Sequence, residues 1–274
     1  MGIVNVTPDS FSHDGHVNPD LAIAQGLRMV GEGASLIDVG GESTRPGSDE
    51  LPVAEEMRRV VPVVEALVSE GVIVSLDTSK PEVAETALDL GVEVINDVTA
   101  CAADGMAQLV AEAECGVVLM HMKGSPQTMQ KGPHYNDVVA EVESFLLLRA
   151  ASVVATGVEP SRITIDPGIG FGKTAEHNLE LLASVPRLAS HGFPLMLGTS
   201  RKRFLDNLLR DDAPVDRDEA TAMTTSTGFV DGARVFRVHN VEASHRALAV
   251  AAAIVADQQW DEWLPDSNRG DSRG

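Results

Sequence analysis

The segment that decides the fold reads VIVSLDTSKPEVAETALDLGVEVIND (72–97). It begins and ends with apolar runs rich in β-branched residues, VIVSLD (72–77) and VEVIND (92–97). Between them, Ser79 and Glu82 have the composition of a helix start, and Gly91 is the residue type that commonly ends a helix. The segment therefore predicts a strand, a helix and a second strand in direct succession.

The same unit recurs on both sides of this segment. Six further apolar runs are IVNV (3–6), SLIDV (35–39), VVLMH (117–121), ITID (163–166), PLMLG (194–198) and RVFRV (234–238). A glycine precedes nearly every later run, at positions 33, 71, 91, 116, 157, 192 and 232. The runs are continuously apolar and do not alternate, as a parallel sheet buried on both faces requires.

Helical periods occupy the intervals between these runs. The clearest spans 53–69, where Val53, Val60 and Leu67 belong to one apolar face, and a last helix is expected at 241–256. Eight strand–helix alternations without a break in composition predict an α/β fold, a single-domain (β/α)8 TIM barrel over residues 1–256. A doubly wound open sheet is the alternative, but eight repeats exceed what such a sheet normally uses.

The chain is strongly acidic and has few cysteines. Asp and Glu number 41 against 21 Lys and Arg, and the formal net charge of −20 repels nucleic-acid phosphates and anionic membranes. The longest apolar stretch, 247–256, is too short to span a bilayer, and no N-terminal run has the pattern of a secretion signal. Cys101 and Cys115 lack zinc-site or disulfide spacing and suit a reducing compartment. The sequence predicts a cytoplasmic enzyme without nucleic-acid or membrane partners, with a disordered polar tail at 257–274.

Polar residues follow the apolar runs, at the end of the barrel where such enzymes build their active sites. In chain order they are Asn5, Asp38, Asp77, Asn96, Asp97, His121, Asp166, Ser200, Arg201, Lys202, Arg237 and His239. One such residue alone is more often a helix cap or a turn former than a catalyst. Polar residues at all eight strand ends indicate a functional site.

Three of these residues suit a flat heterocyclic ligand. The side chains of Asp77, Asn96 and Asp166 can match the amino, ring N–H and carbonyl groups of a pterin or guanine. Asp166 opens the segment DPGIGFGKT (166–174), which imitates nucleotide-binding motifs but fits neither the P-loop nor the dinucleotide fingerprint. Its glycines are expected to let the backbone turn tightly beside a ligand that Asp166 holds, with Phe171 offering an aromatic face.

A second group of residues suits a pyrophosphate. Arg45, Lys202, Arg237 and His239 supply cations in an acidic molecule, and Asn5 supplies a hard oxygen ligand suited to Mg2+. A salt bridge to a neighbouring acid is the alternative role of Arg237 and Lys202. We favour phosphate binding for Arg237, because His239 leaves the last strand on the same side.

Motifs of one enzyme family occur in order along nearly the whole chain. They are GIVNVTPDSFS (2–12), DVGGESTRPG (38–47), SLDTSKPEV (75–83), INDV (95–98), LMHMKGSPQTMQ (119–130), DPGIGFGK (166–173), TSRKRF (199–204) and RVHN (237–240). Through them the chain resembles the dihydropteroate synthases. The resemblance implies a homodimeric TIM-barrel transferase of folate biosynthesis. Such an enzyme condenses 7,8-dihydropterin-6-ylmethyl diphosphate with 4-aminobenzoate to 7,8-dihydropteroate, and releases diphosphate with the help of Mg2+.

The resemblance also implies roles for single residues. The expected pterin contacts are Asp77, Asn96, Asp166 and Lys202, with Met120 and Gly198 lining their pocket. Asn5, Arg237 and His239 are expected at the diphosphate end, with Asn5 as the metal ligand, and Thr44, Arg45, Pro46, Phe171 and Ser200 around the aminobenzoate. No side chain attacks the substrate in this family. Catalysis is therefore expected from charge stabilisation and positioning by Lys202, Arg237, His239, Asp77 and Asp166.

Departures from the family pattern leave these expectations in place. His13-Asp14-Gly15 stands where Asp-Gly-Gly is common, and Asn240 follows His239 where Asp is frequent.

Two other functions are a non-catalytic paralogue that binds pterin and a pterin-dependent methyltransferase on the same barrel. The cations at 45, 202 and 237 argue against the first, and STRPG (43–47) and SRKRF (200–204) against the second. A structural protein would leave the polar strand ends unexplained. We expect Lys202→Ala and Arg237→Ala to nearly abolish turnover and leave the fold intact.

Overall fold

The computed structural model describes residues 1–7, 18–44, 47–48, 50–129, 132–209 and 217–256. Within them lie the strands β1 (Gly2–Asn5), β2 (Ile37–Gly40), β3 (Val74–Asp77), β4 (Val94–Asp97), β5 (Gly116–Met120), β6 (Ile163–Asp166), β7 (Met196–Leu197) and β8 (Val235–Phe236). Each strand coincides with one of the predicted apolar runs. The predicted tail at 257–274 and the departure at 13–15 lie outside the described residues.

The strands close into a parallel barrel. β1 to β6 form one sheet in sequence order, and β7 pairs with β8. A bridge between Ile165 and Leu195 joins β6 to the start of β7, and a bridge between Gly2 and Val238 joins the end of β8 to β1. Across these junctions the Ile165 N–H donates to a backbone carbonyl (2.9 Å), and the Ile3 N–H donates to the Val238 carbonyl (3.0 Å). The predicted TIM barrel is confirmed, and the open sheet is excluded.

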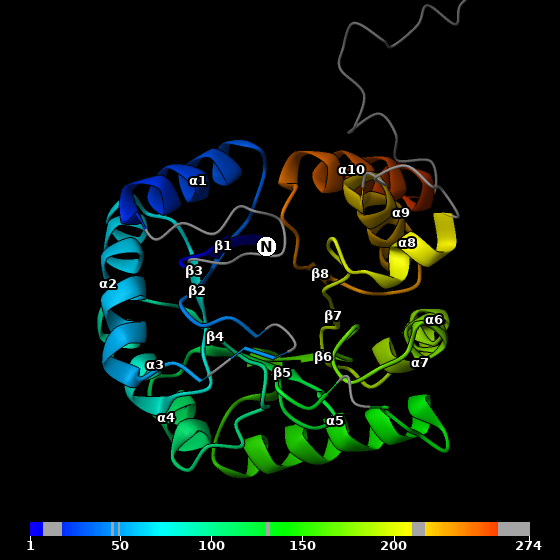
Figure 1. Cartoon of the computed structure of the whole chain (residues 1–274), viewed down its shortest axis with the longest axis horizontal. Helices are drawn as coiled ribbons and strands as arrows, with labels where there is room; N and C mark the ends of the chain where they lie inside the picture. The colour runs from blue at the N-terminus through cyan, green and yellow to red at the C-terminus, as the bar shows by residue number, and fades with distance from the viewer. Residues whose placement is uncertain (8–17, 45–46, 49, 130–131, 210–216, 257–274) are drawn as a thin grey trace, which may run out of the picture.

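The helices form an outer ring around the strands (Figure 1). They are α1 (Pro19–Gly31), α2 (Val53–Ser69), α3 (Pro81–Asp89), α4 (Met106–Glu112), α5 (Val138–Ala155), α6 (Ala175–Ala183), α7 (Val185–Ala189), α8 (Phe204–Leu209), α9 (Arg217–Val230) and α10 (Val241–Val255), with a 3-10 turn at Pro160–Arg162. The helix predicted at 53–69 is confirmed, and the last helix ends one residue before the predicted 256. Two helices fill the interval between β6 and β7. The first ends at Ala183 with Ser184 as its C-cap, because Pro186 cannot donate the backbone hydrogen bond that would continue it.

Turn chemistry explains where helices begin and end. The Asn18 side chain accepts a hydrogen bond from the Asp20 N–H (2.9 Å) and caps α1. A cap at Ser79 would start α3 at Lys80, but α3 starts at Pro81 and Lys80 is its N-cap residue. The fixed φ of proline suits this first helical position. Six of the seven glycines predicted before strands take a positive φ, and the seventh, at 116, lies inside β5.

Aliphatic side chains form one continuous core. Leu76, Ile95 and Leu119 from the strands are fully buried, as are Val60 and Leu67 from α2. Burying one such side chain stabilises the fold by ~1.5–3 kcal/mol. No helix in the described part of the chain is long and apolar enough to cross a membrane. The carboxyl ends of the strands carry buried polar side chains, so the barrel brings these side chains to one end of the molecule.

Candidate active site

Acidic and amide side chains from neighbouring strands meet around Arg237. Asp38 on β2 accepts hydrogen bonds from Arg237 Nε (2.6 Å) and from Asn96 Nδ2 on β4 (3.1 Å). Asp77 at the end of β3 accepts one from Arg237 Nη2 (2.7 Å). Ser75 Oγ donates to the other oxygen of Asp38 (2.6 Å). The barrel therefore brings three predicted site residues together: Asp77, Asn96 and Arg237.

The ion pairs of Arg237 show one of the two roles that the sequence leaves open for it. The guanidinium forms salt bridges with the carboxylates of Asp38 and Asp77, and its role in phosphate binding stays a prediction. The physical reason is that Asp38 is fully buried, and a buried carboxylate needs a charged partner. Burial raises the pKa of Asp77 to about 7, although the positive charge of Arg237 opposes this shift. The two acids account for two of the five N–H donors that a guanidinium carries.

A second group lies at the ends of β6 and β7. The Gly168 N–H donates to Asp166 Oδ1 (2.7 Å) and turns the backbone tightly after β6. Lys202 donates to a backbone carbonyl of this loop, and its Nζ lies 4.5 Å from the centre of the Phe171 ring. A Cβ on Gly198 would lie 3.8 Å from Lys202 Nζ and 3.9 Å from Asp166 Oδ2. Glycine at 198 therefore keeps the space beside these two charges open.

Burial dominates the electrostatics of this second group. It lowers the pKa of Lys202 to about 8, while the negative charge of Asp166 opposes the shift. It raises the pKa of Asp166, while the positive charge of Lys202 opposes that shift. Each charge therefore depends on the other, and a polar ligand that bonds to both would offset the cost of burying them.

The loop after β6 packs closely on the segment after β5. Gly168 and Gly172 have positive φ values of 67° and 64°. A Cβ at Gly168 would overlap the carbonyl oxygen of His121, and one at Gly172 would lie 2.5 Å from the carbonyl oxygen of Lys123. Only glycine meets both the left-handed backbone and the close approach. The predicted tight turn beside Asp166 therefore has a steric cause.

Lys173 is a residue of this loop whose role the sequence reasoning missed. It is 3% exposed, and its Nζ lies 2.9 Å from His121 Nδ1, 3.3 Å from the His121 carbonyl oxygen and 3.0 Å from the Phe171 carbonyl oxygen. Burial lowers the pKa of Lys173 to about 7 and that of His121 to about 3. His121, predicted as one of the strand-end polar residues, therefore supports the loop that carries Phe171. The sequence signal for this role is the lysine of GFGK (170–173), which follows three glycines of the same loop.

Ser200 and His239 bond to each other at the ends of β7 and β8. Ser200 Oγ lies 2.9 Å from His239 Nδ1 and accepts from the His239 N–H (3.0 Å). Between Ser200 and Lys202, Arg201 takes a φ of 56° and pairs with Asp218 on α9 through two bonds of 2.6 and 2.8 Å. Asn240, a departure from the family pattern, accepts from an N–H in the first turn of α10 (3.0 Å) and caps that helix.

Asn5 ends β1 beside the ends of β2 and β3. Its partner in register is Gly40, whose own partner is Asp77. A Cβ on Gly40 would lie 3.8 Å from Asn5 Oδ1 and 3.7 Å from Asp77 Oδ2, so both oxygens flank this glycine. The described residues contain no group of three His, Cys, Asp or Glu able to hold a metal. The amide oxygen of Asn5 is a hard ligand. It fits a Mg2+ ion that takes its remaining ligands from substrate and water.

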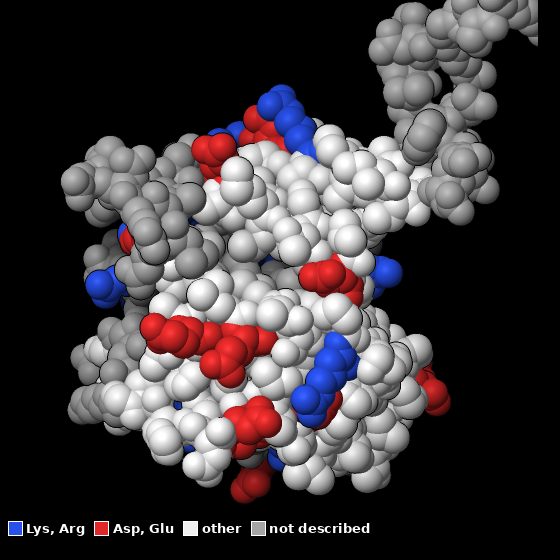
Figure 2. All heavy atoms as spheres, turned by 90° about the vertical axis from the view of Figure 1, so that its right-hand side faces the viewer, with Lys and Arg blue, Asp and Glu red and all other residues white. Residues whose placement is uncertain are grey.

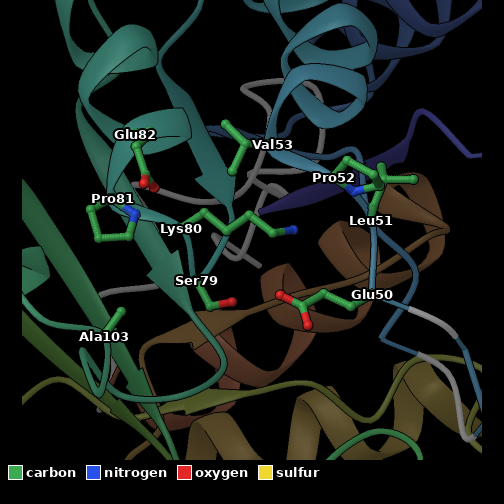
Figure 3. Close-up of a pocket in the computed structure, with 9 residues that line it drawn as sticks. All are labelled: Glu50, Leu51, Pro52, Val53, Ser79, Lys80, Pro81, Glu82 and Ala103. Carbon is green, nitrogen blue, oxygen red and sulfur yellow. The ribbon is translucent and has the colours of Figure 1, made fainter.

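Two cavities adjoin these groups. The smaller, of about 240 Å³, is lined by residues from the loops after β2, β3, β4 and β5, among them Thr44 and Asp77. The larger, of about 590 Å³, lies at the starts of α2 and α3 and contains no predicted site residue (Figure 3). Met120 is buried at the end of β5. Arg45 and Pro46 lie outside the described residues.

Known proteins share both the sequence and the fold. The family model described as "Pterin binding enzyme" matches residues 1–239. A dihydropteroate synthase of Mycobacterium leprae is 47% identical over 261 residues, which cover 92% of each chain. The Xanthomonas albilineans dihydropteroate synthase with 4-aminobenzoic acid is 44% identical, with a TM-score of 0.85 over 93% of this chain and 92% of that one. The same enzyme in complex with 7,8-dihydropteroate is 42% identical, with a TM-score of 0.81 over 93% and 91%.

Proposed function

Because this chain belongs to the dihydropteroate synthase family of pterin-binding enzymes, we propose that the strand-end residues described above perform the reaction of that family. The chain is a transferase that condenses 7,8-dihydropterin-6-ylmethyl diphosphate with 4-aminobenzoate to give 7,8-dihydropteroate and diphosphate. The bond from the methylene carbon to the diphosphate oxygen breaks, the bond from that carbon to the aryl nitrogen forms, and the amine loses a proton. One observation carries the assignment of the reaction to this site: two charge clusters, around Arg237 and around Lys202, converge at one end of the barrel.

The pterin is assigned to the ends of β3, β4, β6 and β7. Asp77 and Asn96 supply hydrogen-bonding groups on one side, and Asp166 and Lys202 on the other. A ligand that donates N–H groups to a buried carboxylate and accepts from a buried ammonium offsets the cost of burying both charges. The open space at Gly198, between Asp166 and Lys202, supports this position for the ring. Met120 completes the proposed pocket.

The diphosphate is assigned to Arg237, His239 and Asn5. Asp38 and Asp77 fix the guanidinium of Arg237 before substrate arrives, and its other N–H donors suit phosphate oxygens. Donors fixed in advance stabilise the negative charge that develops on the leaving diphosphate without a reorganisation cost. Bound Mg2+ would supply further positive charge to those oxygens, and Asn5 Oδ1 is the ligand that this chain offers.

The aminobenzoate is assigned to the side of the site formed by Thr44, Phe171 and Ser200. The Phe171 ring is held by its contact with Lys202, and an aromatic face suits an aryl substrate. Ser200 also bonds to His239, so it lies between the proposed arylamine and diphosphate positions. Arg45 and Pro46 are proposed to join this pocket from the same loop as Thr44.

The chain is also proposed to form a homodimer through the α9–α10 surface, which we define by Met223, Val230, Val250, Ile254 and Val255. These apolar side chains are 48–72% exposed, and α9 and α10 pack side by side. Figure 2, turned so that the right-hand side of Figure 1 faces the viewer, shows uncharged surface between scattered groups of acidic and basic side chains. Large apolar side chains exposed on two helices that pack together support a protein interface at this surface.

A cytoplasmic location is proposed from the state of the cysteines. Cys101 and Cys115 are buried free thiols, and burial raises their pKa values to about 12 and 11. Protonated, buried thiols resist oxidation and suit a reducing compartment. The net charge of −20 supports small-molecule substrates over nucleic acid or anionic membranes as partners.

The test is to incubate the purified chain with the pterin diphosphate, 4-aminobenzoate and Mg2+. Diphosphate release and dihydropteroate formation are followed together. We expect both to appear in equal amounts and to stop when the metal is chelated. Tight pterin binding without any product would contradict the proposal and favour a non-catalytic paralogue.

A further inference from the structure

We propose that Lys80 is a positioning residue for the arylamine substrate, acting through an ion pair that anchors the second loop. The second loop is the segment 41–50, which follows β2 and carries Thr44. This inference rests on the assignment of Thr44 to the aminobenzoate side of the site. Lys80 itself belongs to none of the proposed substrate contacts.

Lys80 follows β3 and joins two acids. Its Nζ donates to Glu56 Oε2 on α2 (2.6 Å) and to Glu42 in the second loop. Glu56 is 1% exposed, and its other oxygen accepts from Thr78 Oγ1 (2.7 Å). Burial alone would lower the pKa of Lys80, but its bonds to Glu42 and Glu56 outweigh this effect and raise it. The barrel therefore holds a fixed positive charge, to which Glu42 ties the second loop.

Other contacts hold the two ends of the described part of the second loop. Near β2, Arg59 Nη1 donates to the Gly41 carbonyl (3.1 Å), and a Cβ on Gly41 would lie 2.6 Å from Val60 Cγ1. Further along, the Gly47 N–H donates to a backbone carbonyl in the loop after β5 (3.0 Å). Glu42 lies between these contacts and only two residues before Thr44. Within the loop, Ser48 Oγ donates to the Ser43 carbonyl (2.5 Å). Among the ion pairs of the described residues, the Glu42–Lys80 pair is the one nearest in sequence to Thr44, and it ties this stretch to the barrel.

The cavities show which part of the site this anchor shapes. Glu50, Ser79 and Lys80 line both cavities, and Figure 3 shows the Lys80 side chain extending across the larger one. Glu42 and Thr44 line only the smaller. The ion pair thus belongs to the wall of the smaller cavity on the side of Thr44. Loss of the pair would release that wall and leave the pterin groups on β3, β4 and β6 in place.

Glu42→Gln is the variant that tests this role. It removes the charge of the second loop and leaves the Lys80–Glu56 pair inside the barrel. We expect the KM for 4-aminobenzoate to rise about tenfold, because a charge-assisted hydrogen bond is lost. We expect kcat and the Kd for the pterin diphosphate to stay unchanged. Glu143→Gln is the matched control, since it removes an acid paired with Arg187 on the outer ring, and it should alter none of these constants.

A double-mutant cycle shows whether Glu42 acts through Lys80. In a Lys80→Gln background, adding Glu42→Gln should raise the KM for 4-aminobenzoate by less than about twofold, because the partner is already absent. Lys80→Gln leaves Glu56 buried beside Thr78 alone, so thermal unfolding of every variant is measured with the kinetics. An additive tenfold rise in this background would overturn the role of Lys80.

Thr44→Ala separates the two ways in which the inference can fail. If Thr44→Ala leaves the KM for 4-aminobenzoate unchanged, the arylamine assignment is wrong and the role of Lys80 falls with it. If Thr44→Ala raises that KM and Glu42→Gln does not, only the role of Lys80 is wrong. An equal rise in the pterin Kd and the aminobenzoate KM in Glu42→Gln would also overturn it, since that pattern indicates general loosening of the site.

Discussion

At the scale of single residues, the site is built from buried charges that depend on their partners. Arg237 is the clearest case, because it is the cation that hydrogen-bonds to both Asp38 and Asp77. Removing one partner of a buried ion pair costs ~3–5 kcal/mol, since it leaves an uncompensated charge. We therefore expect Arg237→Ala to keep the fold but to have a lower free energy of unfolding.

Arg237→Ala and Lys202→Ala should have the same effect on turnover but different effects on the free energy of unfolding. Both should nearly abolish turnover, because each removes a cation from the site. Arg237→Ala should also lower the free energy of unfolding by ~3–5 kcal/mol. Lys202→Ala should lower it less, because Asp166 loses the opposing charge of Lys202 but keeps its hydrogen bond from the Gly168 N–H. Urea unfolding and diphosphate release measure the two effects, and wild-type turnover in either variant would contradict the site assignment.

His121 should make stability depend on pH. Its pKa is lowered from 6.5 to about 3 in the folded chain, so between these values the unfolded chain binds a proton that the folded chain does not. The free energy of unfolding therefore falls as pH falls, by ~2 kcal/mol between about pH 6.5 and about pH 5. His121→Gln should remove this part of the slope, and His134→Gln, at an exposed position, should retain it. Urea unfolding at the two pH values checks the prediction, and equal slopes in all three proteins would refute it.

At the scale of elements, the loop after β6 is the part of the site most sensitive to backbone changes. Gly168→Ala adds a Cβ that overlaps the His121 carbonyl, at a φ of 67°. We expect a loss of at least ~2 kcal/mol in the free energy of unfolding and weaker pterin binding, because the Gly168 N–H also bonds to Asp166. Gly31→Ala is the control: it lies at the end of α1 with nothing within 4 Å of the added Cβ, and it should change stability by ~1 kcal/mol or less. Calorimetry and pterin titration of both variants test this, and equal behaviour would argue against the packing described.

The elements themselves were largely predictable from the sequence. Buried parallel strands carry continuous apolar runs, so all eight strands were located, and their polar ends pointed to the site. The division of α6 from α7 was missed, although Pro186 explains it. The pairing of Arg237 with Asp38 could not be predicted, because these residues lie 199 positions apart and meet only when the barrel closes. The contacts of Lys173 depend likewise on the packing of one loop against another.

At the scale of the whole molecule, the α9–α10 surface should decide the oligomeric state. Ile254→Asp places a charge at a 72% exposed position on this surface and should convert a dimer to a monomer, because burying an unpaired charge opposes association. Leu148→Asp on α5 is the matched control, since Leu148 is also 72% exposed. Size-exclusion chromatography with light scattering measures both. A monomeric wild-type chain, or equal effects of the two substitutions, would count against this interface.

The closure of the barrel divides the site between two unequal pieces. Asp38, Asp77 and Asn96 belong to the six-stranded sheet, whereas Lys202 and Arg237 follow β7 and β8. Among the described residues, one backbone hydrogen bond joins β6 to the start of β7 and three join β8 to β1, whereas β5 and β6 pair at four positions. A transient parting at either junction would separate the cations from the acids while most of the core stays folded. Heat inactivation should therefore precede the loss of the helical circular dichroism signal, and the amide hydrogen of Ile3 should exchange with solvent faster than that of Leu76. The time for which activity persists on warming is then set by how long both junctions of the barrel stay closed.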